Sequence, residues 1–250
     1  MQPAISLNDI RRAFKNHFWQ QKREVLNGIT LDIHEGEVFG FLGPNGAGKT
    51  TTIKIITGLI RPDAGQVSIF GIPPDSLEAK RRIGFLPESP YFYEHLTGHE
   101  FLRIHSLLCN GGQHDRTAAE LLERVGLTDA RDVQLRAYSR GMLQRVGIAQ
   151  ALIGSPDLLI LDEPLTGLDP IGRKEIKDLI LEQKSKGTTI FFSSHILPDA
   201  EAVCDRVGIL IEGQLKEVGK LSDVLKKGVD KDQMTLEDWF VKHTQKPGSH

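Results

Sequence analysis

The stretch that most constrains this chain is GPNGAGKTT, at residues 43–51. It fits the pattern G-x-x-x-x-G-K-[ST] and lies between an apolar run, EVFGFL, and a helical pattern, TTIKIITGL. Glycines 46 and 48 allow the backbone to curl so that successive N–H groups point at one anion. A helix that begins at Lys49 would present its positive end to the same anion. The segment therefore predicts a phosphate-binding loop for a nucleoside triphosphate.

The residue types in this loop suit a triphosphate bound together with Mg²⁺. Lys49 is expected to reach the β- and γ-phosphates as a point charge, and the Thr50 hydroxyl is expected to bind Mg²⁺. A flexible loop that matches by chance is the alternative, and the strand–loop–helix order argues against it. We expect nucleotide contacts from the whole loop: Gly43, Pro44, Asn45, Gly46, Ala47, Gly48, Lys49, Thr50 and Thr51.

A second segment, LLILDEP at residues 158–164, joins four apolar residues to two carboxylates. Asp162 is therefore expected at the carboxyl edge of a central strand, where parallel sheets place their ligands. We expect Asp162 to hold Mg²⁺ through water, and Glu163 to polarise an attacking water as general base. The alternative is a strand followed by an acidic turn, and the phosphate loop in the same chain argues against it.

Short apolar runs alternate with helical patterns along the chain, and this order predicts an α/β fold with a mainly parallel sheet. The runs expected to be buried strands cover residues 37–42, 83–86, 158–161 and 188–192. AISLNDI and VLNGITLDIHEGE alternate in polarity and predict antiparallel strands added at one side. VGILIEGQLKEVG predicts the same, as a hairpin that turns at Glu212 and Gly213.

Residues from about 91 to 154 carry only helical patterns, which predicts an inserted α-helical subdomain. The expected fold is thus that of a P-loop NTPase, with an antiparallel β subdomain and this helical insertion. We expect one ATPase domain over residues 1–226 and a polar tail over residues 227–250. The tail contains a short amphipathic piece, LEDWFVKH.

Composition limits the partners and the compartment. The 31 basic and 33 acidic residues give a net charge of −2, which argues against a dedicated nucleic-acid binder. No apolar run approaches the roughly 18 residues that cross a bilayer, and the N-terminus lacks the apolar core of a signal peptide. We expect a soluble, cytoplasmic protein. Cys109 and Cys204 lie far apart without metal-ligand spacing, so we expect buried structural thiols in a reducing compartment.

GPNGAGKTT, LLILDEP, TGLD and SSH follow one another in the order found in the nucleotide-binding subunits of ABC transporters. The chain resembles that family from about residue 4 to residue 220. The family signature, L-S-G-G-Q followed by Q-R, falls on YSRGMLQR at residues 138–145. Ser139 is also a good N-cap for the helix that the apolar spacing predicts after it.

The resemblance implies an ATPase built from two such domains in head-to-tail pairs. Each ATP would lie between the phosphate loop of one subunit and the signature helix of the other. Ser139, Arg140, Gly141 and Met142 would then face the ATP of the partner, with Ser139 and the Gly141 backbone at its γ-phosphate. His195 matches the switch histidine that contacts the γ-phosphate and orients the attacking water. Asp169 matches the loop that communicates between the two sites.

The family stacks adenine on an aromatic residue near the N-terminus, and here Phe14 is the first choice and Trp19 the second. Three positions depart from the usual pattern, and one of them is Met142, which stands where the family signature has glutamine. Glu88 replaces a glutamine, and its carboxylate can approach Mg²⁺ but adds negative charge beside the triphosphate. Arg140 replaces a glycine, and either contact with the nucleotide or exposure to solvent is compatible with the sequence.

The P-E pair after the strand and the Y-S-[KR]-G-M signature resemble the branch that serves exporters of drugs, antibiotics and polysaccharides. This implies an ATPase subunit that powers a separately encoded membrane permease, and that is held through it at the inner face of the membrane. The partner ATPase would be a second copy or a homologous subunit. Tyr91, Phe92 and Tyr93 would line the permease groove, or else pack within the helical subdomain.

The sequence argues against two alternative functions. Non-transport ABC ATPases that act on ribosomes or DNA carry paired ATPase units, a coiled-coil insertion or zinc-binding cysteines, and this sequence contains none of these. A binding module without hydrolysis would not need Glu163 and His195, which are both present.

Overall fold

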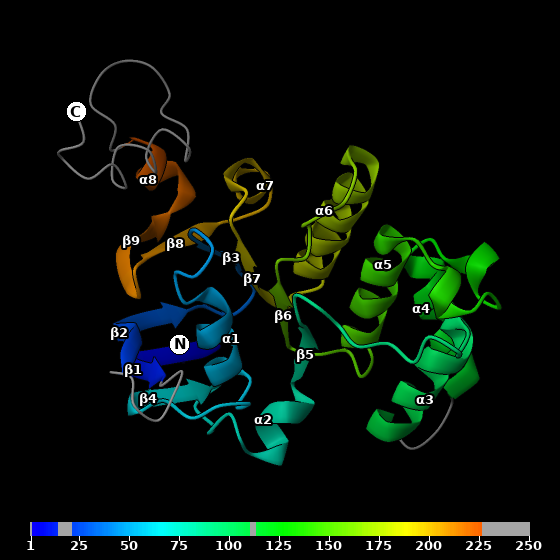
Figure 1. Ribbon diagram of the computed structural model, residues 1–250, viewed down its shortest axis with the longest axis horizontal. Coiled ribbons are helices and arrows are strands. Elements are labelled where there is room, and N and C mark those ends of the chain that lie inside the picture. Colours follow the sequence, from blue (N-terminus) through cyan, green and yellow to red (C-terminus); the bar gives the residue numbers. More distant parts are fainter. Residues whose placement is uncertain (1, 15–21, 111–113, 227–250) are drawn as a thin grey trace.

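The computed structural model describes residues 2–14, 22–110 and 114–226 (Figure 1). Two sheets stand beside a group of helices, and the first sheet has the order β2-β1-β4. Its strands are β1 (Ile5–Phe14), β2 (Arg23–Ile33) and β4 (Ala64–Ile69), and all are antiparallel. The first two were predicted. The third was not, because its sequence AGQVSI contains mostly residues of low β-propensity and is exposed over its first half.

The second sheet has six strands in the order β5-β6-β7-β3-β8-β9. These are β5 (Ile83–Leu86), β6 (Leu158–Asp162), β7 (Thr189–Ser194), β3 (Val38–Leu42), β8 (Arg206–Ile211) and β9 (Gln214–Lys220). All pairs are parallel except β8 with β9. The four apolar runs therefore became strands, as predicted.

The expected hairpin turns at Glu212 and Gly213, both of which have positive φ, at 48° and 74°. One part of that prediction was incomplete. β8 is itself a parallel member of the main sheet beside β3, and only β9 is antiparallel. The four central residues of β8 are buried, as expected for a strand inside a parallel sheet.

The helices are α1 (Lys49–Ile56), α2 (Leu77–Arg81), α3 (Gly98–Asn110), α4 (His114–Arg124), α5 (Arg140–Ala151), α6 (Pro170–Ser185), α7 (Leu197–Glu201) and α8 (Leu221–Lys226). Two 3-10 turns, Thr128–Ala130 and Leu135–Ala137, precede α5. α3 and α4 lie at the end of the molecule opposite the antiparallel sheet (Figure 1). Between residues 91 and 154 the described chain contains no named strand, as predicted for the helical subdomain. The domain limits at 226 and 227 stay a prediction.

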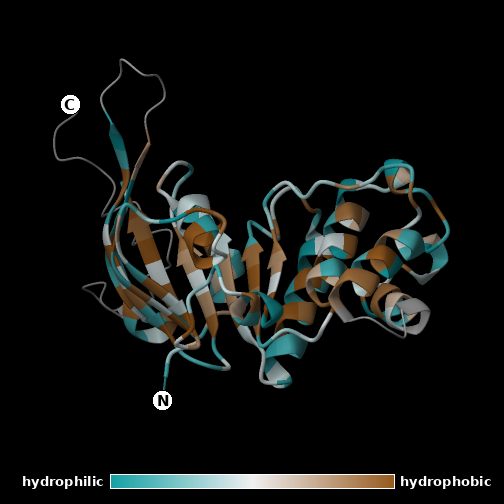
Figure 2. Cartoon of the chain, turned by 90° about the horizontal axis from the view of Figure 1, so that it is seen from below, coloured by the Kyte–Doolittle hydropathy of each residue, from teal (hydrophilic) through white to brown (hydrophobic). Residues whose placement is uncertain are grey.

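An apolar core lies between the two sheets and α1. Phe191 of β7 is its centre, with its ring 6.0 Å from that of Phe39 and 5.4 Å from that of Phe41. Ile53 and Ile56 of α1 belong to the same cluster. Figure 2 shows the hydrophobic colour concentrated on the central strands. This packing fixes the carboxyl ends of β3 and β7, from which the candidate site is built.

The prediction of buried cysteine thiols was wrong for Cys109, but Cys204 packs against the core, where burial raises the pKa of its thiol. Cys109 is exposed, and Cys204 is half-buried. Cys109 lies near the end of α3. Cys204 packs beside Gly40, where a β-carbon would lie 2.6 Å from its sulfur. Trp19 and LEDWFVKH lie outside the described residues. Within the described part of the chain, no helix is both long and apolar enough to cross a membrane.

We expect Phe191→Ala to lower the free energy of unfolding by about 3–5 kcal/mol, because it leaves a cavity in the fully buried core. Urea unfolding followed by circular dichroism measures the change. Leu59→Ala is the control, since Leu59 is largely exposed and its loss should cost less than about 0.5 kcal/mol. Equal losses for both variants would contradict this account of the core.

Candidate nucleotide-binding site

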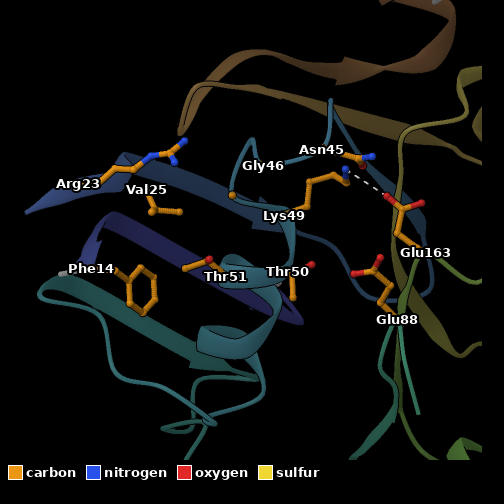
Figure 3. Close-up of a pocket in the computed structure, with 11 residues that line it drawn as sticks. Phe14, Arg23, Val25, Asn45, Gly46, Lys49, Thr50, Thr51, Glu88 and Glu163 are labelled. Atoms are coloured by element: carbon orange, nitrogen blue, oxygen red, sulfur yellow. Dashed lines mark ion pairs between the residues drawn. The ribbon is translucent and has the colours of Figure 1, made fainter. Parts of the chain in front are cut away.

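A cavity of about 420 Å³ opens beside the phosphate loop. Figure 3 shows Phe14 at one end, Glu88 and Glu163 at the other, and Lys49 between them. Its walls come from both sheets, the loop and α1. The lining residues are Phe14, Arg23, Val25, Asn45, Gly46, Gly48, Lys49, Thr50, Thr51, Glu88 and Glu163.

The phosphate loop has the backbone that its glycines predicted. Gly46 and Gly48 have φ angles of 79° and 112°, which residues with a β-carbon rarely adopt. A β-carbon at Gly48 would also lie 2.6 Å from Cδ2 of Leu26. The Gly43 N–H donates to the Ser194 carbonyl over 3.2 Å, which ties the start of the loop to the end of β7. α1 begins at Lys49, as predicted.

Lys49 is almost fully buried, with 6% of its side chain exposed. Its ammonium donates to the carbonyls of Gly43, over 2.8 Å, and Pro44, over 3.3 Å. Its third oxygen neighbour is Oε1 of Glu163, at 3.1 Å (Figure 3). The cation is therefore held at the carboxyl edge of the parallel sheet, facing the cavity.

Asp162 ends β6 and is held from β7. The Ser193 hydroxyl donates to Oδ1 of Asp162 over 2.6 Å, and the same hydroxyl accepts the Glu163 N–H over 2.9 Å. Thr50 also hydrogen-bonds to Asp162. One serine thus fixes the backbone and side chain of the two neighbouring acidic residues.

Glu163 is the most constrained residue of the site. Its φ is 52°, a left-handed conformation that costs a non-glycine residue about 1–3 kcal/mol and often occurs at functional sites. Oε2 accepts from the Thr166 hydroxyl over 2.9 Å and lies 2.8 Å from Nδ1 of His195. Oε1 faces Lys49 as an ion pair without a hydrogen bond of good geometry. The structure therefore brings Lys49, Glu163 and His195 together at one end of the cavity, a contact that the sequence did not predict.

The two acidic neighbours have opposite pKa shifts. Burial is the largest influence on Asp162 and raises its pKa, and the charges of Glu88 and Glu163 raise it further, against hydrogen bonds from Ser193 and Thr50. Burial also acts to raise the pKa of Glu163, but the charge of Lys49, together with hydrogen bonds from Thr166 and His195, lowers it overall. No positive charge is among the described groups that shift the pKa of Asp162.

The residues present suit Mg²⁺ bound together with phosphate. Asp162 and the Thr50 hydroxyl meet at the phosphate loop, and Glu88 faces the same cavity. Among the described residues, no cluster of three or more His, Cys, Asp or Glu could hold a metal alone. This agrees with the usual mode of Mg²⁺, which takes one or two protein oxygens and fills its other positions with phosphate and water.

Other predicted residues lie away from this cavity. Ser139 caps α5, with its hydroxyl accepting the Met142 N–H over 3.2 Å. Asp169 caps α6, with Oδ1 accepting the Gly172 N–H over 2.8 Å. Ser139, Arg140, Gly141, Met142 and Asp169 do not line the nucleotide cavity. Arg140 lines a separate cavity of about 220 Å³, which Glu88 and Glu163 also border.

Sequence reasoning missed Ser193, Thr166 and Arg23. Ser193 belongs to the recognised SSH segment, so its place at the end of a buried strand beside two acidic residues was the available signal. Thr166 follows Glu163 by three residues, but only the turn between them brings its hydroxyl back. Arg23 belongs to no recognised motif. It lines the cavity because the antiparallel pairing of β1 and β2 places it opposite Phe14.

The phosphate loop thus faces Glu163, which is paired with His195. The family model described as "ABC transporter" matches residues 26–166, more than half of the chain. This chain belongs to the ABC transporter ATP-binding family. Its matched segment contains the phosphate loop, α5, Asp162 at the end of β6 and Glu163 directly after it. The ABC protein is therefore an ATPase of that family.

Named relatives agree. An ABC transporter ATP-binding protein of Nostoc sp. is 43% identical, over 99% of this chain and 77% of its own. The bacitracin transport ATP-binding protein BcrA of Bacillus licheniformis is 48% identical, over 76% of this chain and 62% of its own. The linearmycin resistance ATP-binding protein LnrL of Bacillus subtilis is 38% identical, over 81% and 67%. The chain thus spans about two thirds to three quarters of these relatives.

Solved structures share the fold. The structure of an ATP-binding subunit of an ABC transporter has a TM-score of 0.83 and 33% identity, and the match covers 97% of this chain and all of that one. The cassette MJ0796, dimeric in a post-hydrolysis state with ADP and Pi, has a TM-score of 0.79 and 26% identity, over 86% of this chain and 98% of that one.

Replacing the two acidic residues by amides is expected to change stability in opposite directions without nucleotide. Asp162 has a raised pKa, so its charge opposes folding, and Asp162→Asn should raise the free energy of unfolding at pH 7. Glu163 has a lowered pKa and pairs with Lys49, so Glu163→Gln should lower it by about 1–3 kcal/mol.

The pH dependence gives the second check, by urea unfolding from pH 7 downward. The penalty from Asp162 disappears as the pH falls through its folded-state pKa toward the unfolded one, so the advantage of Asp162→Asn should shrink. The stabilisation from Glu163 is complete above its unfolded-state pKa and is lost as the pH falls through the lowered folded-state pKa. Shifts of the same sign for both variants at pH 7 would contradict this electrostatic account.

Proposed function

We propose that this protein is the ATP-hydrolysing subunit of an ABC exporter and drives a separately encoded membrane permease. The observation that carries the proposal is the convergence of Lys49, Glu163 and His195 at one end of the nucleotide cavity. ATP would place its phosphates in the loop of residues 43–51 and its adenine toward Phe14, which lines the other end (Figure 3).

Binding of phosphate changes the partners of Lys49. Its ammonium already faces the cavity, and a γ-phosphate competes with Glu163 for it because the phosphate carries more charge. Glu163 then loses the cation that most lowers its pKa and becomes a better proton acceptor for an attacking water. His195, bonded to Oε2 of Glu163, orients the carboxylate. Mg²⁺ held at Thr50 and Asp162 would neutralise charge on the phosphates.

Hydrolysis is proposed to need a second ATPase subunit, either another copy or a homologue. Ser139 is exposed and lies outside the cavity of its own chain, so its helix end is free to meet the γ-phosphate bound by a partner. The dimeric structures of the cassette MJ0796 support this arrangement. Closure around ATP and reopening after hydrolysis would supply the two states that move the permease.

The permease is proposed to dock on the helical subdomain, which would place the protein at the inner face of the membrane. Tyr91 is 87% exposed and Tyr93 is 51% exposed, with their rings in edge contact at 6.1 Å. Phe92 instead packs inward on Phe101, at 5.4 Å. The names of BcrA and LnrL, which concern bacitracin transport and linearmycin resistance, support export as the direction.

Glu163→Gln should reduce ATP turnover by about 10²–10⁴-fold, because it removes the general base while leaving the phosphate loop intact. ATP should still bind, and the complex should accumulate as a dimer. Phosphate release and size-exclusion chromatography with ATP measure the two effects. Turnover near that of the wild type would refute the assignment of Glu163.

Ser139→Arg should leave ATP binding by the monomer intact and abolish turnover, because the bulky side chain would block the partner's γ-phosphate. Binding is measured with a fluorescent ATP analogue, and turnover by phosphate release. Ser76→Arg is the matched control, since Ser76 also caps a helix, by accepting the Ala79 N–H over 3.1 Å, but that helix is α2. Loss of monomer binding in Ser139→Arg alone would count against a role in the partner's site.

A further inference from the structure

Arg140, the first residue of α5, packs on the segment of residues 163–169 of its own chain. Its guanidinium lies against Gly167, so that a β-carbon at residue 167 would overlap it. Gly167 also has φ of 74°, which favours glycine. Arg140 is exposed, and its guanidinium covers the turn at Gly167 in the loop between Glu163 and Asp169.

Two further contacts join α5 to the same segment. Gln144, one turn after Arg140, is buried, and its Nε2 donates to the Pro164 carbonyl over 3.0 Å. Leu168 reaches the α5 backbone, with Cδ2 3.6 Å from the place of a β-carbon on Gly141. One face of the first turns of α5 therefore contacts the segment 163–169 from just after Glu163 to just before Asp169.

This contact lies next to the candidate general base. Arg140, Gln144, Thr166 and Glu163 line the same cavity of about 220 Å³. Thr166 holds Oε2 of Glu163, and Glu163 has a strained backbone that only its surroundings can maintain. A shift of the segment 163–169 would therefore move the carboxylate relative to Lys49 and His195.

We propose that Arg140 and Gln144 are positioning residues for hydrolysis within their own chain. By holding the segment 163–169, they set the place of Glu163, and the inference rests on the proposed role of Glu163 as general base. The helix end would then serve two ATP sites at once. Ser139 would face the partner's ATP, while Arg140 and Gln144 would support the chain's own site.

Linked dimers separate this action from a contact with the partner's ATP. Two copies are joined through a glycine-serine linker, and one half carries Glu163→Gln, so that only the other half hydrolyses ATP. Arg140→Ala is then placed in either half. We expect kcat to fall at least tenfold more when Arg140→Ala lies in the hydrolysing half, with KM for ATP changed by less than about twofold.

The opposite pattern, a larger loss or a raised KM when Arg140→Ala lies in the other half, would overturn the inference, as would equal losses from both halves. Gly167→Ala and Gln144→Leu, placed in the hydrolysing half, should lower kcat in the same manner. Arg136→Ala is the matched control, since Arg136 is an exposed arginine that precedes the capping serine and does not line either cavity. Arg140→Lys should recover most of kcat, because its aliphatic stem can also cover Gly167.

The unmodified linked dimer and its Glu163→Gln forms test the underlying function separately. The proposed function fails if the dimer with one Glu163→Gln half hydrolyses ATP no faster than the dimer with two such halves. It also fails if the dimer with two such halves hydrolyses ATP as fast as the unmodified dimer. If those dimers behave as expected and Arg140→Ala shows no preference for the hydrolysing half, only the positioning role fails. Thermal unfolding of each variant in the presence of ATP shows that the folded dimer is being compared.

Discussion

The order of three strands in the parallel sheet is the constraint on which the site depends. β7 lies between β3 and β6, so the phosphate loop, the Asp162–Glu163 pair and the Ser193–His195 segment all leave the sheet at one edge. The ion pair of Lys49 with Glu163 joins the phosphate loop to the acidic pair. Ser193 joins the acidic pair to the end of β7 through two hydrogen bonds. Beneath this edge, Phe191 of β7 packs on Phe39 and Phe41 of β3.

At that edge, charge is unevenly shared in a way that suits the binding of a polyanion with a cation. Lys49 neutralises Glu163, whose pKa falls, while Asp162 remains buried without a cation, and its pKa rises. A triphosphate would take Lys49, and a divalent cation would meet Asp162. The burial of Lys49, Glu163 and Asp162 costs folding free energy, but it would leave one site for the phosphates and one for the cation of the ligand.

Much of this was predictable because the signals are local. The phosphate loop depends on glycines and a lysine within nine residues, and the strands of the main sheet are continuous apolar runs. The misses arose where local sequence is weak. β4 has little strand propensity, and β8 resembles a hairpin strand until its pairing with β3 places it inside the sheet. Cys109 was expected to be buried on composition alone, but burial depends on which side of α3 faces the core.

The sequence by itself determined the chemistry available to this protein: a phosphate loop, two successive carboxylates after a strand, a histidine after another, and a capping serine before a helix. Only the tertiary structure decided which of these groups meet. Lys49 and Glu163 are distant in sequence, and no local pattern specifies that the pair forms or that Glu163 takes a left-handed backbone. Arg140 was ambiguous in sequence, and its place against Gly167 follows from the packing of α5 on a loop. Such contacts depend on long-range packing, which fixes distances that periodicity and spacing do not encode.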